Sequence, residues 1–390
     1  MGSTANTLTN LIPTLYLALD KVSRELVGFI PAVTRDSSLA RAAVGQTVRS
    51  FVAPASTAGE IAPNVTPPDD GEQDIGNIIL AINHARRVPI RWQGEESMQM
   101  NSPGGPTVNA IMVDQFAQAM RTLVNEIETD LAGLYVNASR AIVPDSATTL
   151  FSATLKDAAA VLKILLDNGA PINDLQCVID TTTGAALRGL SVLNAVDSSG
   201  DKDLLRQGIL GDLMGMKIRE SAQVITPAIG TEEDATVNTA AYSVGDTVLT
   251  LADAGSGTVV AGDIISLASL TDYYINKTLN ASLPTTTLTL NANGLRTAIL
   301  GDASPAITVR AASSRSMAFA KSAIVLATRA PALPAEGDMA VDRTFITDPR
   351  SGLSFEVAKY MQYRQVQYEI SIAWGVKVVK EAHVALLAGD

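Results

Sequence analysis

The feature that most limits how this chain can fold is a long excursion between residues 45 and 94. Two strand-like limbs, 47–53 and 75–92, flank a segment of turn-forming residues, Ala62-Pro-Asn-Val-Thr-Pro-Pro-Asp-Asp-Gly71. This pattern predicts two strands joined by a Pro-rich tip. An isolated hairpin is marginally stable in water, and it exposes strand edges that a monomer should avoid. We therefore expect the excursion to be an extended loop that lies across another subunit.

Apolar residues spaced three or four apart predict two long helices. The first covers residues 7–33 and is ended by Pro31. It is either an ordinary amphipathic helix or an arm that packs on a neighbouring chain. The second runs from Pro106 to about Ser139 and is long for a globular protein. Its polar side, which we expect to face away from the apolar stripe, carries Gln118, Arg121, Asn125 and Glu128.

Residues 154–194 have a mixed α and β pattern. A helix is predicted from Thr154 to a stop at Gly169. A short buried strand over 175–179 and a second helix over 182–193 follow it. Cys177, the single cysteine, lies in this strand, where a buried and inert thiol is expected.

The composition changes near residue 226. Between Ser221 and Arg310 the chain has three basic residues against eight acidic ones, and threonine is frequent. Strand-like runs alternate with turn signals at 247–251, 263–267, 286–290 and 306–309. This spacing predicts an inserted all-β domain, a small barrel or sandwich.

The chain then returns to its earlier composition. One strand-like segment is predicted over 317–327, with Pro331 and Pro334 breaking it. Three further strands are predicted at 353–360, 366–373 and 375–379. Residues 381–390 form a short, mildly apolar tail.

Residues that carry common catalytic chemistry are scarce. The chain has two histidines, His84 and His383, and one cysteine, and it lacks nucleotide-binding and zinc-protease motifs. We therefore predict no catalytic, cofactor-binding or metal-binding residues and no cofactor. Trp92 and Trp374 are expected to be packing anchors. The net charge of −11 argues against a face that grips nucleic-acid phosphates.

The start of the chain does not have the pattern of a targeting signal. Residues 1–19 contain no Lys or Arg, so a charged leading region is missing. No run of about 18 apolar residues is present that would predict a membrane span. We expect the chain to be cytoplasmic where it is made.

Four stretches, in their order along the chain, carry a resemblance to a known family. They are Asn6 to Pro31, Gly208 to Ile218 with Glu220-Ser221, Met317 to Ile324, and Ser371 to Val379. In this order they resemble the major capsid (coat) proteins of tailed double-stranded-DNA bacteriophages, which have the Hong Kong 97-type fold. The resemblance is in particular to short-tailed phage coat proteins that carry an insertion domain.

The resemblance implies an α+β Hong Kong 97-type capsid fold with an inserted all-β domain. Its implied parts are an N-terminal arm (1–44), an extended loop (45–94), a peripheral domain with a long spine helix (95–150), an axial domain (151–225 and 312–341) interrupted by the inserted β domain (226–311), and C-terminal strands of the peripheral domain (342–390). In some relatives a Lys of the extended loop forms an isopeptide cross-link with an Asn of a neighbour. Since this chain has no Lys between Lys21 and Lys156, we predict a non-covalent shell.

The resemblance also implies a function, which is not enzymatic. The chain would be a major capsid protein that self-assembles into the icosahedral shell of a bacteriophage virion, through a scaffolded procapsid that expands on packaging. Its implied partners are identical subunits in pentamers and hexamers, a scaffolding protein and a portal, with double-stranded DNA contacted only weakly and no membrane. Assembly would take place in the bacterial host cytoplasm. Two alternatives remain open: an encapsulin-type compartment shell, and an acidic enzyme built from scattered carboxylates.

Overall fold

The structure is a computed structural model of the chain. It describes residues 18, 27–52, 58, 61, 63, 76–96, 108–144, 149–151, 154–190, 211–252, 255–268, 270–278, 281–283, 287–301, 303–347 and 352–389. Most of the predicted helix at 7–33, nearly all of the predicted tip at 62–71 and the end of the predicted helix at 182–193 lie outside these residues. No helix among the described residues is long and apolar enough to cross a membrane.

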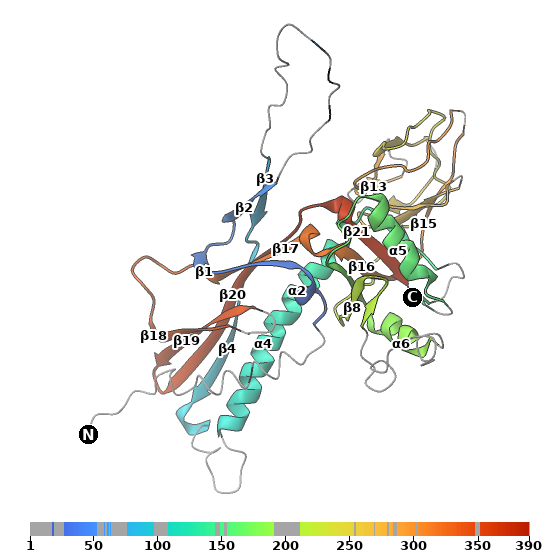
Figure 1. Ribbon diagram of the computed structural model, residues 1–390. Coiled ribbons are helices and arrows are strands. Elements are labelled where there is room, and N and C mark those ends of the chain that lie inside the picture. The colour runs from blue at the N-terminus through green and yellow to red at the C-terminus, as the bar shows by residue number, and fades with distance from the viewer. Residues whose placement is uncertain are drawn as a thin grey trace, which may run out of the picture.

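Two large sheets form the body of the molecule (Figure 1). The six-stranded sheet contains β1 (Thr34–Ala42), β17 (Ile324–Pro331), β20 (Gln365–Val378), β19 (Ser354–Gln362) and β18 (Ala340–Thr347) in that order, with β4 (His84–Gln93) also pairing with β20. The nine-stranded sheet has the order β15 (Ile307–Val309), β11 (Ile264–Leu267), β12 (Tyr273–Ile275), β5 (Arg140–Ile142), β21 (Val384–Gly389), β16 (Ser314–Ala320), β6 (Leu175–Ile179), β8 (Met216–Glu220) and β7 (Asp212–Leu213).

Helices cover both sheets. Helix α4 (Val108–Ala132) packs on β4 and β20 of the six-stranded sheet, where the rings of Phe116 and Tyr368 form a T-shaped pair with centroids 5.6 Å apart. Helix α5 (Lys156–Asp167) packs on β5 and β21 of the nine-stranded sheet, and α6 (Thr181–Gly189) follows β6. Gly169 has φ +72°, which fits the predicted stop after α5.

The predicted long helix is confirmed but ends early. The α-helical part ends at Ala132, and residues Gly133–Asn137 continue as a 3-10 turn, η2. Gly133 disfavours the α-helix because it has the most backbone freedom to lose. The predicted helix end at Pro31 differs as well, since Pro31 lies inside the short helix α2 (Phe29–Ala32). Proline is tolerated there because a first helical turn needs no N–H donor.

Three strand predictions near the C-terminal end were wrong in their limits. The segment 317–327 is divided by the 3-10 turn η3 (Lys321–Ala323), so that β16 and β17 lie in different sheets. The segments 366–373 and 375–379 form one strand, β20, because Gly375 keeps its place in the ladder opposite Ala327. The tail is the buried strand β21, which pairs with β5 and β16 and so lies outside the sheet of the other C-terminal strands.

The threonine-rich segment contains the predicted short strands and has a hydrophobic cluster of its own. Two small strand pairs, β9 (Val248–Thr250) with β14 (Thr287–Thr289) and β10 (Thr258–Val259) with β13 (Ala281–Ser282), and five isolated bridges connect its described residues. The strands β11, β12 and β15 nevertheless extend the nine-stranded sheet, because β12 pairs with β5. The limits 226–311 of an inserted domain stay a prediction.

The Cys177 thiol offers a chemical test of this core. Its side chain is 1% exposed on β6, and burial raises the thiol pKa to about 12. Because only the thiolate reacts with alkylating agents, native protein at pH 8 should resist iodoacetamide, and denatured protein should react completely. Mass spectrometry of the two samples measures this, and rapid alkylation of the native chain would contradict the buried β6.

Candidate functional site

The residue types singled out from the sequence do not converge on one site. His84 begins β4, and His383 is buried in the 3-10 turn η4 (Glu381–His383), where burial lowers its pKa. Trp92 and Trp374 are both buried, as expected of packing anchors. Each indole N–H also has an acceptor, on Gln115 and Asp130 respectively. Among the described residues no group of three or more His, Cys, Asp or Glu side chains could hold a metal ion.

A two-stranded hairpin projects from the body (Figure 1). Strands β2 (Thr47–Val52) and β3 (Gly76–Ala81) pair with each other in antiparallel register, and within the described residues they pair with no other strand. Ile79 on β3 is 44% exposed. In its described part, the predicted excursion is therefore a hairpin whose two outer edges pair with no other described strand, as the sequence indicated. The predicted second limb, 75–92, is wrong in its extent, because β3 ends at Ala81 and residues 84–93 form β4, which pairs with β20.

The root of the hairpin is fixed to the six-stranded sheet. Asn83 N donates to Trp374 O at 3.1 Å, and Lys377 Nζ donates to Ile79 O at 2.9 Å. A small hydrophobic cluster lies beneath the root and contains Ala42, Leu80, Ile82, Ala327 and Ala373. These contacts set the direction in which the hairpin leaves the body.

His84 joins the hairpin root to α4. Its ring stacks on Trp374 with centroids 5.4 Å apart, and its Nε2 lies 3.4 Å from Asp130 Oδ2. Asp130 Oδ2 also accepts the Trp374 indole N–H at 2.7 Å. A hollow of about 390 Å³ opens beside this cluster. Burial raises the pKa of the Glu128 and Asp263 carboxyls. Neither of these two side chains lines the hollow.

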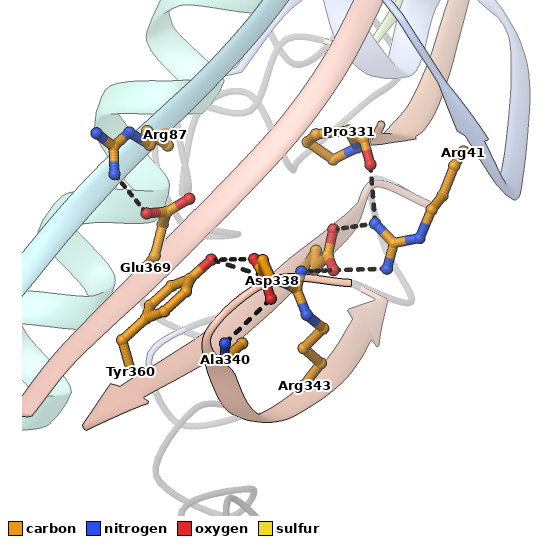
Figure 2. Close-up of polar contacts among 9 residues, drawn as sticks. Arg41, Arg87, Pro331, Asp338, Ala340, Arg343, Tyr360 and Glu369 are labelled. Atoms are coloured by element: carbon orange, nitrogen blue, oxygen red, sulfur yellow. Dashed lines mark hydrogen bonds and ion pairs between the residues drawn. The ribbon is translucent and has the colours of Figure 1, made fainter. Parts of the chain in front are cut away.

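A network of ion pairs and hydrogen bonds connects β1 to other strands of the six-stranded sheet (Figure 2). The Glu356 carboxylate, whose side chain is 2% exposed, accepts from Arg41 Nη2 at 2.7 Å and from Arg343 Nη1 at 2.8 Å. Arg41 also donates to Pro331 O at 2.8 Å. Arg343 pairs with Asp338, and its guanidinium lowers the pKa of that carboxyl to about 2. The network therefore connects β1, β17, β18 and β19.

A second buried carboxylate holds the segment that precedes β1. Glu128 on α4 is 1% exposed, although the sequence pattern predicted that it would face solvent. It accepts backbone N–H groups of Gly28, Phe29 and Ile30 and the hydroxyl of Ser221. Burial raises its pKa, and these hydrogen bonds oppose that rise. Glu128 lies four residues after Val124 and three before Leu131, both buried, and this position on the apolar stripe was the signal available in the sequence.

No protein-family model matches the chain, and no curated protein matches it significantly. Among solved structures it is similar to one of Mycobacterium phage Che8 (14% identity, 88% of this chain and 84% of that chain covered, TM-score 0.45). It is also similar to the capsid of Cyanophage P-SCSP1u (12%, 94% and 89%, TM-score 0.50) and to the mature capsid of bacteriophage PhiM1 (11%, 93% and 86%, TM-score 0.47). The likeness to the Cyanophage P-SCSP1u capsid shows that the chain shares the fold of that capsid structure, in agreement with the expected Hong Kong 97-type capsid fold.

Proposed function

We propose that this chain is the major capsid protein of a tailed bacteriophage and that it assembles with copies of itself into an icosahedral shell around double-stranded DNA. The observation that carries the proposal is the β2–β3 hairpin, whose two edges are open within the described chain, on a body with the capsid fold. A neighbouring subunit would cover the edges that a monomer leaves exposed. The chain would act as a structural protein and not as an enzyme.

The arrangement of rigid and projecting parts supports this proposal. A closed shell places one chain in slightly different surroundings, so a rigid two-sheet body with a projecting hairpin is well suited to it. Many modest contacts between identical subunits, in pentamers and hexamers, sum to a durable shell while single wrong contacts can dissociate. Expansion of a scaffolded procapsid would be a rearrangement of rigid parts about hinges.

The net charge affects how strongly the shell would bind DNA, and the positions of the lysines decide whether its subunits could be cross-linked. With a net charge of −11, the wall would hold packaged DNA only weakly. The described hairpin carries no Lys on either strand, and the sequence has none between Lys21 and Lys156. Subunits would therefore be joined without a Lys–Asn cross-link from the extended loop. The scaffolding protein and the portal are proposed as assembly partners.

Assembly of the purified chain tests the proposal. The full-length chain should form closed particles when it is co-expressed with the scaffolding protein of its source, as seen by negative-stain electron microscopy. Boiling these particles in SDS should release the capsid chain as a band of 40.8 kDa, without cross-linked multiples of that mass. Deleting residues 63–72 should reduce particle yield and leave the circular-dichroism spectrum of the subunit unchanged. Soluble monomers under all conditions, or closed particles formed equally well without residues 63–72, would contradict it.

A further inference from the structure

In the described part of the N-terminal arm, the backbone at residues 28–30 is bound by one carboxylate, that of Glu128. Glu128 Oε2 accepts the N–H of Phe29 at 3.0 Å and of Gly28 at 3.3 Å, and Oε1 accepts the N–H of Ile30 at 2.7 Å. Oε2 also accepts the Ser221 hydroxyl at 2.8 Å. An ionised carboxylate has about four acceptor positions, so these four donors satisfy it in a site from which water is excluded.

Within the described part of the arm, helix α2 does not cap its own first amides. Helix α2 is four residues long, and its N-cap residue, Gly28, makes no side-chain capping bond. The first N–H groups of a helix have no partner within the helix, and leaving them buried and unpaired is costly. Glu128, about 100 residues later in the chain, supplies the missing acceptors.

Gly28 makes the close approach possible. A Cβ atom on residue 28 would lie 2.7 Å from Glu220 O, 2.8 Å from Val178 Cγ1 and 2.9 Å from Ser221 Cβ. The φ of Gly28 is −101°, so the glycine is needed for space and not for an unusual backbone conformation. The arm backbone therefore passes directly against β6 and the end of β8.

The chain after the anchor is fixed on the other sheet. Phe29, Ile30 and Val33 are fully buried, and Thr34 begins β1, which pairs in parallel with β17. Helix α4, which carries Glu128, packs on the six-stranded sheet, whereas Ser221 follows β8 of the nine-stranded sheet. One carboxylate, carried by a helix that packs on the six-stranded sheet, thus contacts the segment just before β1 and the residue just after β8 of the nine-stranded sheet.

We propose that Glu128 is a positioning residue that couples the attachment of the N-terminal arm to the relative orientation of the two sheets. A rotation of one sheet against the other would pull Ser221 or residues 28–30 away from the carboxylate. While the hydrogen bonds between Glu128 and residues 28–30 are intact, the arm can change direction only before Gly28. We call these hydrogen bonds the anchor. The anchor belongs to the folded subunit, and its role in shell assembly rests on the proposed function.

Hydrogen exchange of the full-length chain measures the anchor directly. In wild-type protein the amides of residues 28–30 should exchange as slowly as those in the middle of α4. Glu128→Ala should speed their exchange at least about tenfold, since each hydrogen bond to a charged group is worth more than a neutral one. Glu128→Gln keeps one carbonyl oxygen and turns an NH2 group toward a donor, so it should give an intermediate value. Fast exchange of residues 28–30 in the wild type would overturn the proposal without any variant.

Glu126 on the same helix provides a matched control. Its side chain is 46% exposed and lies 3.6 Å from Arg86 Nε. Glu126→Ala and Glu126→Gln should leave exchange of residues 28–30 unchanged. If the Glu128 and Glu126 variants gave the same exchange at these amides, the anchor would be disproved.

The assembly readout separates this inference from the proposed function. If the wild type forms shells, Glu128→Gln should raise the fraction of aberrant particles above that of Glu126→Gln. Equal fractions would overturn the role of the anchor in assembly. If the wild type forms no shells and the exchange results are as expected, the proposed function fails and the anchor stands.

Discussion

Replacing Glu356 with alanine should lower the free energy of unfolding by about 3 kcal/mol, the lower end of the range for a buried ion pair that loses one partner. The Glu356 carboxylate pairs with the guanidinium groups of both Arg41 and Arg343. Without it, two like charges would face each other in a partly desolvated site. The loss of unfolding free energy should be near the lower end of that range because the Arg41 and Arg343 side chains are 32% and 20% exposed and remain partly hydrated. Urea denaturation followed by circular dichroism measures the change.

Glu369 supplies the matched control for this experiment. It accepts from Arg87 Nη1 at 2.6 Å on the same sheet, where the Arg87 side chain is 61% exposed and that of Glu369 is 14% exposed (Figure 2). Because water screens the exposed Arg87 guanidinium, Glu369→Ala should cost only about 1 kcal/mol. Equal losses for the two variants would mean that the Glu356 network does not stabilise the sheet beyond an ordinary surface pair.

Elements with a strong local pattern could be predicted from the sequence. Helix α4, strand β6 and the first hairpin limb each have an apolar period that needs no knowledge of distant partners. The short strands at 264–267 and 287–289 were also found because turn residues separate them. The hairpin was also recognisable as a projecting element, because turn-forming residues separate its two limbs.

The remaining features depend on residues far apart in the chain. Arg41 and Glu356 are 315 positions apart, and no local pattern connects them. Strand β21 is buried because β5 and β16 lie on either side of it, although its six residues are only mildly apolar as a sequence. Glu128 differs in that its place among buried residues of α4 was visible, but its partners in the arm were not.

Substitution of Gly375 should have the largest effect on the direction of the hairpin. A Cβ atom on residue 375 would lie 2.0 Å from Ala81 O and 3.1 Å from Ile82 Cα, at the hairpin root. The clash is with backbone, so no side-chain rotation can relieve it. Gly375→Ala should therefore push the root away from β20 and cost about 3 kcal/mol of unfolding free energy, toward the upper end for overpacking.

Gly133→Ala is the control, since a Cβ on residue 133 meets nothing within 4 Å. It should leave stability unchanged or raise it by up to about 1 kcal/mol, because alanine loses less backbone entropy on folding. Under the proposed function, the Gly375 variant that still folds should yield fewer closed particles than the Gly133 variant, because a misdirected hairpin cannot reach the neighbouring subunit. Thermal denaturation and electron microscopy of the two variants measure both effects. Wild-type stability and particle yield for Gly375→Ala would show that contact between β20 and residues 81–82 does not set the hairpin direction.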